Sequence, residues 1–327
     1  MNRCLASLEP RDQEGINERA QHALANGRRR FPHVVEYTRS ELVQYRIEHG
    51  RSMSISGVQD KISMVLERGT LKPTEAGGRY ILKPIPRLDV PQFEQEVPAN
   101  EHVCMLMART LYSLKTAECS LVRMRDGELA YITRRFDYDG DEKVLQEDFC
   151  QLLNRSSETG GENYKYTGSY EEVGQAIANS CASAMVQLPE YLRLLLYSYL
   201  IGNGDLHLKN ISLMTTKQGD YVLTPAYDIL SSTLHLPNES RLALDLVDDS
   251  RKHSANYTAN AFETGQCFIE MGERLGVNAS TTVEKLDLLA RKQSPAEQMI
   301  RRSYLTPEAQ DRLIAIMRDR LKALAIV

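Results

Sequence analysis

Length, composition and charge narrow the kind of protein before any motif is considered. The chain has 327 residues, 42% hydrophobic and 26% charged, so it can bury one large core or two moderate ones. A net charge of −4 provides no field that would attract nucleic acid, and the six cysteines lack the spacing of a zinc site. No apolar run is long enough to span a membrane, so we expect a cytoplasmic protein.

Residues 1–50 are predicted to form a helical N-terminal extension. Charged, helix-prone segments at 18–25 and 40–50 favour two helices, and Gly50 is expected to end the second. The sequence assigns this region no role beyond bracing the chain.

Residues 51–137 have the apolar period of a small, largely antiparallel sheet. Alternation at 62, 64 and 66 predicts one strand, "YILK" predicts another, and two runs around Asp126-Gly127 predict a hairpin. A helix with Asn100 as its N-cap is expected between the two strand pairs.

Helices are predicted to dominate from about residue 145 onward. Apolar periodicity favours helices at 145–154, 169–180 and 189–201, with several more after residue 238. Two segments differ: 210–225 has the pattern of a hairpin, and 154–168 is a polar, glycine-rich loop expected to be mobile or to bind a ligand. Sheet and helices together predict an α+β protein.

Several polar residues gather directly after the apolar helix predicted at 189–201. Asp205 and Asn210 are five residues apart, as in the catalytic loop of protein kinases, and Asp228 follows eighteen residues later. One carboxylate can accept the proton of an incoming hydroxyl, while an amide and a second carboxylate supply the oxygen ligands that Mg²⁺ prefers. The pattern favours phosphoryl transfer from ATP.

Each of these residues also has an ordinary interpretation. An Asp after a helix often forms a turn, Asp228 could cap a helix, His207 could be a structural histidine, and Lys209 could be a solvated charge. Only their joint order on loops beside strands supports the kinase interpretation.

The predicted sheet offers further groups suited to a nucleotide. Lys83 ends an apolar strand, from which it can reach phosphate oxygens, and Glu101 can pair with it or simply favour a helix N-terminus. The segment 52–61, "SMSISGVQDK", fits a phosphate-covering loop or an ordinary turn. Phe136, at the end of the sheet, could meet adenine or pack in the core.

Six motifs taken together resemble the HipA family of bacterial serine/threonine kinase toxins. In chain order they are "SISGVQDKISMVL", "YILKP", "NEH", "RRFD", "GNGDLHLKN" and "PAYDILSS". The resemblance covers residues 51–235, and the early "SIS" loop is similar to the short HipT-type form. It implies a two-lobed protein-kinase-like fold, with an extension at 1–50, an N-lobe at 51–137 and a C-lobe at 138–327.

The same resemblance implies a role for individual residues. Asp205 would accept the proton, Asn210 and Asp228 would hold Mg²⁺, and Ser54 and Ser56 would be autophosphorylated. The residues expected to contact ATP are Ser56, Gly57, Val58, Gln59, Asp60, Lys61, Lys83, Glu101, Arg134, Arg135, Phe136, His207, Leu208, Lys209, Asn210, Tyr227 and Asp228. The family has an acidic residue at the position of Arg134, which matters only if the side chain, not the backbone, meets adenine.

The resemblance also implies an activity and partners. The expected activity is that of a toxin in a toxin-antitoxin system, transferring the γ-phosphoryl group of ATP to a Ser or Thr of a protein, with an aminoacyl-tRNA synthetase as the expected substrate. Expected partners are a small antitoxin resembling the N-terminal subdomain of longer HipA proteins and a helix-turn-helix repressor, without direct contact to nucleic acid or membrane. Two alternatives remain: a small-molecule kinase of the aminoglycoside or choline type, which shares the "GDLHxxN" loop, and a catalytically inactive kinase-like binding module.

Overall fold

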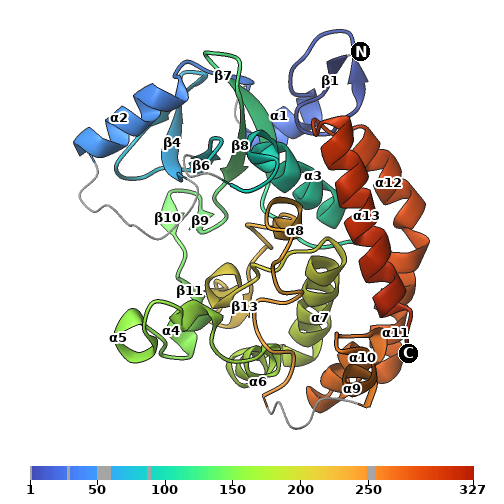
Figure 1. The fold of residues 1–327 in the computed structure, drawn as a ribbon. Helices are drawn as coiled ribbons and strands as arrows, with labels where there is room; N and C mark the ends of the chain where they lie inside the picture. Colours follow the sequence, from blue (N-terminus) through green and yellow to red (C-terminus); the bar gives the residue numbers. More distant parts are fainter. Residues whose placement is uncertain (1, 28–29, 50–59, 87–89, 249–254) are drawn as a thin grey trace. The chain divides into compact units, whose positions relative to one another are not determined.

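The computed structural model describes residues 2–27, 30–49, 60–86, 90–248 and 255–327 (Figure 1). Contacts within the chain group it into two units. Unit 1 comprises Met1–Met107, Ala117–Arg135 and Gln298–Asp311, and unit 2 comprises Ala108–Thr116, Phe136–Glu297 and Arg312–Val327. The three-part division predicted at residues 50 and 137 stays a prediction.

A six-stranded sheet forms the centre of unit 1. In spatial order its strands are β3 (Val34–Val35), β7 (Cys119–Met124), β8 (Leu129–Arg134), β6 (Tyr80–Lys83), β4 (Ile62–Glu67) and β5 (Thr70–Pro73). Strands β3 and β7 pair in parallel, and the other neighbours are antiparallel, which confirms the largely antiparallel sheet. The predicted hairpin joins β7 to β8 through Gly127, whose φ of 91° is a left-handed conformation that glycine adopts without strain.

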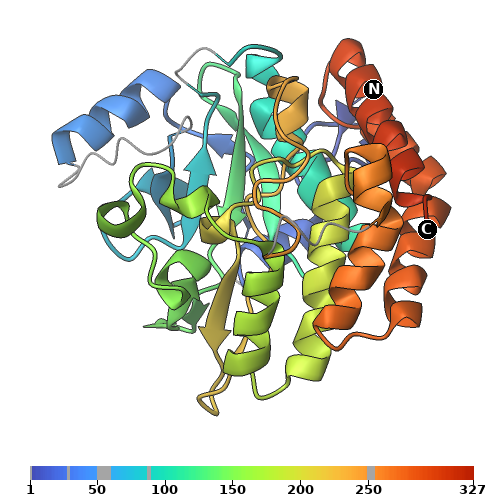
Figure 2. The same cartoon turned by 60° about the horizontal axis from the view of Figure 1, so that its bottom comes forward.

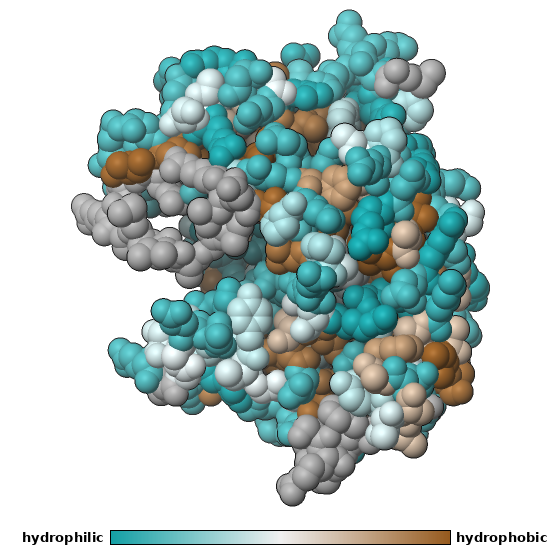
Figure 3. Space-filling view, viewed as in Figure 1, coloured by the Kyte–Doolittle hydropathy of each residue, from teal (hydrophilic) through white to brown (hydrophobic). Residues whose placement is uncertain are grey.

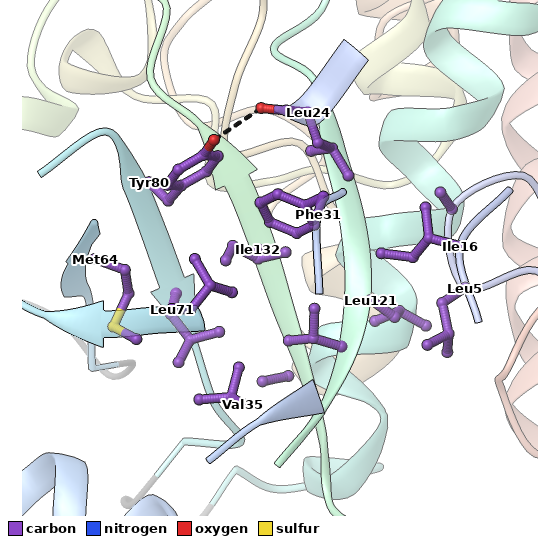
Figure 4. Close-up of a cluster of buried hydrophobic side chains, with 14 of the residues drawn as sticks. Leu5, Ile16, Leu24, Phe31, Val35, Met64, Leu71, Tyr80, Leu121 and Ile132 are labelled. Carbon is purple, nitrogen blue, oxygen red and sulfur yellow. Dashed lines mark hydrogen bonds between the residues drawn. The ribbon is translucent and has the colours of Figure 1, made fainter. Parts of the chain in front are cut away.

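The hydrophobic core of unit 1 includes much of the N-terminal region (Figure 4). Leu5, Leu24 and Phe31 are buried in one cluster with Tyr80 and Ile132 of the sheet. The rings of Phe31 and Tyr80 lie 5.1 Å apart between centroids, and the Tyr80 hydroxyl donates a hydrogen bond of 2.9 Å to the Leu24 carbonyl oxygen. Residues predicted only as an extension therefore contribute to the core.

The helices of unit 1 follow the prediction with one difference. The remaining elements of this unit are β1 (Asn2–Arg3), β2 (Pro10–Arg11), α1 (Glu18–Leu24), α2 (Arg39–His49), the 3₁₀ helix η1 (Glu94–Glu96) and most of α3 (Val97–Thr110). Helices α1 and α2 lie where they were predicted. The prediction of Asn100 as an N-cap is wrong, because η1 leads directly into α3 at Val97 and Asn100 is fully buried inside the helix.

Unit 2 is mainly helical. Its elements are β9 (Tyr138–Asp139), β10 (Glu142–Lys143), β11 (Gln146–Asp148), α4 (Phe149–Leu152), α5 (Ser157–Gly160), η2 (Tyr164–Tyr166), α6 (Tyr170–Ser180), α7 (Ala184–Leu200), η3 (Leu208–Asn210), β12 (Ser212–Thr215), β13 (Tyr221–Leu223), α8 (Ser232–His235), α9 (Ala255–Asn260), α10 (Gly265–Arg274) and α11 (Ala279–Arg291). Helices α12 (Gln293–Arg301) and α13 (Pro307–Leu324) contribute to both units.

Helix α7 is the central helix of unit 2. It packs against α6, α10 and α11, and α6 and α7 lie side by side in Figure 2. The C-terminal part of α7 is buried, and Gly202, with a φ of 69°, follows the C-cap Ile201, the last residue of the predicted helix. The start of the helix was wrong: α7 begins at Ala184, before Pro189, which lies inside it.

A three-stranded sheet carries the residues that follow α7. Strand β12 pairs antiparallel with β13, which confirms the predicted hairpin, and also with β11. The helix predicted at 145–154 is therefore partly wrong, because Gln146–Asp148 pairs with β12 and only Phe149–Leu152 is helical. Asp148 caps that short helix by accepting a hydrogen bond from the Gln151 backbone N–H at 3.0 Å.

All six cysteine side chains are buried thiols. Within the described ranges, no helix combines the length and the apolarity needed to cross a bilayer. Hydrophilic residues cover most of the coloured surface in Figure 3.

Candidate active site

The loop after α7 is folded around the backbone of Asp205. The Asp205 N–H donates to the Asn203 side-chain oxygen at 3.1 Å. The Asp205 carbonyl oxygen accepts from the His207 N–H at 2.8 Å and from the Asn210 side-chain amide at 3.0 Å. These bonds fix the two predicted residues Asp205 and Asn210 in one turn and leave the Asp205 side chain 40% exposed.

Gly204, the residue before Asp205, is held by hydrogen bonds to residues that the sequence analysis did not predict as part of the site. Its N–H donates to the Ser232 hydroxyl at 2.8 Å, and that hydroxyl donates to the Glu239 carboxylate. A Cβ atom at Gly204 would lie 2.4 Å from the Ser240 carbonyl oxygen, so only glycine fits. "LSS" and "PNES" carry no pattern from which this support could have been predicted.

The Asp205 carboxylate faces one tyrosine and one histidine. The Tyr166 hydroxyl donates to Asp205 Oδ1 at 2.6 Å, and His207 Nε2 lies 3.9 Å from the same oxygen. Burial lowers the pKa of His207 to about 4, against a smaller opposing effect of the Asp205 charge. His207 is therefore neutral near pH 7 and does not form an ion pair with the Asp205 carboxylate.

The side chains of Asn210 and Asp228 suit a hard cation. Because Asn210 uses its amide nitrogen on the Asp205 carbonyl, its Oδ1 is left for a ligand, and the part of the chain that is described contains no donor to that atom. The Asp228 carboxylate is close enough to affect the pKa of His207 electrostatically. An amide oxygen and a carboxylate are the donor types that Mg²⁺ takes in phosphoryl-transfer sites.

Tyr227 connects the turn of Asp228 to the loop of Asp205. Its hydroxyl donates to the Lys209 carbonyl oxygen at 2.9 Å and shares a hydrogen bond with Ser212. Asp228 itself has a φ of 54°, a left-handed conformation that is rare for residues other than glycine. Strained backbone of this kind occurs preferentially at functional sites.

Lys83 and Glu101 form the predicted ion pair inside unit 1. The Lys83 ammonium lies 2.6 Å from Glu101 Oε1, and the two side chains are only 3% and 1% exposed. The ammonium also lies 5.4 Å from the centre of the Tyr131 ring. The pair joins β6 to α3, while its contact with ATP stays a prediction.

The other predicted ATP contacts have varied surroundings. Ser54 and the residues from Ser56 to Gln59 lie outside the described residues; Asp60 is buried and Lys61 exposed. Leu208 is fully buried, and the Lys209 ammonium lies 5.2 Å from the centre of the Tyr164 ring. Roles in nucleotide binding for these residues stay predictions.

The segment predicted to meet adenine is engaged within the protein. The Arg134 guanidinium donates to the Ala23 carbonyl oxygen at 2.6 Å, at the end of α1, and the Arg135 N–H donates to the Arg79 carbonyl oxygen at 2.9 Å. The ring of Phe136 packs 5.6 Å from that of Tyr227. The Arg134 side chain thus has a structural role, so an adenine contact there would have to use the backbone.

Known proteins with similar sequences are kinases by name. The sequence profile of the HipA-like C-terminal domain family matches residues 53–302. A Haemophilus influenzae protein named "Putative kinase" is 27% identical over this whole chain and 98% of its own length. The serine/threonine-protein kinase toxin HipA of Shewanella oneidensis is 26% identical over 73% of this chain and 55% of its own length. The chain therefore aligns with nearly all of one relative and about half of the other.

Solved structures share the fold. HipA of Shewanella oneidensis, solved with HipB and its operator DNA, superimposes with a TM-score of 0.60 at 20% identity, over 88% of this chain and 70% of that one. The proinflammatory kinase CtkA of Helicobacter pylori gives 0.54 at 16% identity, over 81% and 90%. Because the family profile spans more than half of the sequence, this chain belongs to the HipA-like C-terminal domain family.

Proposed function

We propose that this protein is an ATP-dependent serine/threonine protein kinase whose catalytic base is Asp205. The observation that carries the proposal is the loop geometry: a half-exposed carboxylate at Asp205, with the Asn210 side chain bonded to the carbonyl of the same residue. That arrangement offers a proton acceptor and a metal ligand from one rigid turn. Kinase names among the sequence relatives support it.

The proposed reaction transfers one phosphoryl group. The substrate hydroxyl gives its proton to an oxygen of Asp205 while its own oxygen bonds to the γ-phosphorus of ATP, and the bond from that phosphorus to ADP breaks. Asp205 therefore needs an exposed oxygen and a fixed orientation. The hydrogen bonds of the loop supply the fixed orientation.

Other residues of the chain would bind the nucleotide. Asn210 and Asp228 would hold Mg²⁺, which when bound neutralises charge on the phosphates, and Lys83 would contact a phosphate as a point charge. The buried partner Glu101 keeps the Lys83 ammonium in one orientation. Ser54 and Ser56 are the proposed autophosphorylation sites.

The biological role proposed here is that of a cytoplasmic toxin in a bacterial toxin-antitoxin system, of the short HipT type. The Shewanella relative carries the name of a kinase toxin, and its structure contains HipB and operator DNA. By analogy, the partners would be a small antitoxin and a helix-turn-helix repressor that itself contacts DNA. The proposed substrate is an aminoacyl-tRNA synthetase.

Identification of phosphopeptides tests this function. The protein is incubated with a bacterial lysate, ATP and magnesium, and the phosphopeptides are compared with those from Asp205→Asn and from Asp220→Asn, a matched change at an exposed aspartate of unit 2. We expect new phosphoserine or phosphothreonine with wild type and Asp220→Asn only. Transfer of phosphate to a small molecule instead of a protein would indicate a kinase of the aminoglycoside type. No phosphate transfer at all would indicate a binding module.

A further inference from the structure

Tyr166 is the only described side chain whose hydroxyl bonds the Asp205 carboxylate. It comes from η2, in the glycine-rich loop between α4 and α6 that the sequence predicted to be mobile or to bind a ligand. The phenol oxygen lies 2.6 Å from Asp205 Oδ1. A donor that close to a proposed general base affects the base directly.

The loop that carries Tyr166 is held by contacts independent of Asp205. Arg155 donates to the Thr167 carbonyl oxygen at 3.0 Å and to its hydroxyl at 2.8 Å. The same guanidinium pairs with Glu172 of α6 at 2.6 Å. The backbone on the C-terminal side of Tyr166 is thereby fixed to a long helix.

The ring of Tyr166 is also held from its sides. Its edge contact with the His207 ring has a centroid distance of 5.1 Å, and the Lys165 ammonium lies 4.9 Å from its centre. These contacts orient the ring independently of the hydrogen bond between its hydroxyl and Asp205. The hydroxyl also remains a donor, because burial, together with the nearby Asp205 charge, raises the pKa of Tyr166.

The two oxygens of Asp205 differ in their surroundings. Oδ1 accepts the Tyr166 hydrogen bond and faces His207. Oδ2 accepts no hydrogen bond from any residue that the structure describes, and the side chain is 40% exposed. A substrate hydroxyl can therefore approach Oδ2 while Tyr166 keeps Oδ1.

We propose that Tyr166 is a positioning residue that holds Oδ1 of Asp205 and so directs Oδ2 toward the substrate hydroxyl. This inference rests on the proposed phosphoryl transfer. A carboxylate held at one oxygen cannot rotate without losing a charge-assisted hydrogen bond, so its second oxygen stays in a productive direction. The competing possibility, that Tyr166 occupies the substrate's place and inhibits, predicts the opposite change in rate.

Tyr166→Phe isolates the hydroxyl, because it retains the ring contacts with His207 and Lys165. Tyr221→Phe is the matched control: it removes another tyrosine hydroxyl bonded to a carboxylate, that of Glu147, elsewhere in unit 2. Initial rates of transfer from γ-labelled ATP to lysate protein are measured for wild type, both variants, Asp205→Asn, and Asp205→Asn with Tyr166→Phe. Melting temperature and the KM for ATP are recorded for each.

We expect Tyr166→Phe to lower kcat about 10-fold, with unchanged KM for ATP and melting temperature, and Tyr221→Phe to match wild type. In the Asp205→Asn background the tyrosine change should have no further effect, because both residues act through one oxygen pair. A rate equal to or above wild type for Tyr166→Phe, or the same fold-loss in both backgrounds, would overturn the assignment. Wild type without any transfer would remove the proposed kinase function, and this inference with it.

Discussion

At the scale of single residues, the proposed chemistry depends on how Asp205 is surrounded. Its backbone is tied by Asn203 and Asn210, its Oδ1 by Tyr166, and the preceding Gly204 by Ser232. The sequence pattern placed Asp205 and Asn210 in one loop, and the structure shows them hydrogen-bonded there, while their roles stay a proposal. The supporting residues Tyr166 and Ser232 come from other segments of the chain, and no local sequence pattern predicts their contacts.

Glu239 makes stability depend on pH in a predictable direction. Burial raises its pKa to about 7 from 4.5, the Asp205 charge adds to this, and its hydrogen bond to Ser232 and the charge of Arg320 oppose it. The folded state therefore binds more protons than the unfolded state between these values. The contribution of Glu239 is fully present below pH 4.5 and is lost as the pH rises through about 7.

Glu239→Gln should remove this dependence. The free energy of unfolding of the variant minus that of wild type should therefore increase from about pH 5 to about pH 8, because only wild type loses the contribution of Glu239. Urea denaturation at both pH values measures the difference, with the exposed Glu142→Gln as control. The comparison with wild type is needed because His207 also makes stability depend on pH. Its pKa is lowered to about 4, so its contribution to stability is lost as the pH falls below 6.5, which is the opposite direction. Parallel profiles for wild type and Glu239→Gln would contradict the assignment.

At the scale of helices and strands, the sequence predicted what local periodicity determines. Strand β4 follows an alternation of buried and less buried residues, whereas β7 and β8 are apolar runs that are buried almost throughout. Helix α6 begins at Tyr170, inside its predicted segment, with Ser169 as N-cap. The predicted bounds of two helices were wrong. Gln146–Asp148 became a strand because β12 offers it a partner. Helix α7 extends back to Ala184 although Pro189 lies inside it and lacks the N–H that an interior helical residue donates.

The ion pair of Lys83 and Glu101 should be important for linking β6 to α3. Both side chains are buried, so removing one leaves a buried charge without its ion-pair partner. Glu101→Gln or Lys83→Met should each cost about 3–5 kcal/mol of unfolding free energy. The double variant Lys83→Met with Glu101→Gln should cost less than the sum of these two single changes, because neither charge then remains buried.

The exposed pair of Lys72 and Glu67 gives the matched comparison in the same unit. Its atoms are 3.2 Å apart with side chains 51% and 54% exposed, so Lys72→Met should cost less than about 1 kcal/mol. Chemical denaturation measures all four variants. Equal costs for the buried and exposed lysines would show that Lys83 is not held by a buried pair.

At the scale of the whole molecule, segments outside the family profile belong to the same core. The profile matches residues 53–302, yet Leu5, Leu24 and Phe31 are buried in unit 1. From the other end of the chain, the Tyr304 hydroxyl donates to the Arg3 carbonyl oxygen at 2.8 Å, and the Thr306 N–H donates to Glu96 at 3.1 Å. Periodicity could not predict these contacts, because they join residues about 200 to 300 positions apart.

The rate of phosphoryl transfer by Asp205→Asn at saturating ATP and magnesium tests the account most directly. The substitution keeps the size of the side chain and the backbone hydrogen bonds of the loop but removes the proton acceptor. We predict that transfer to protein falls on the order of 10²-fold or more, while ATP binding measured by titration is retained. Transfer at the wild-type rate by a folded Asp205→Asn protein would contradict the assignment of Asp205 as the base.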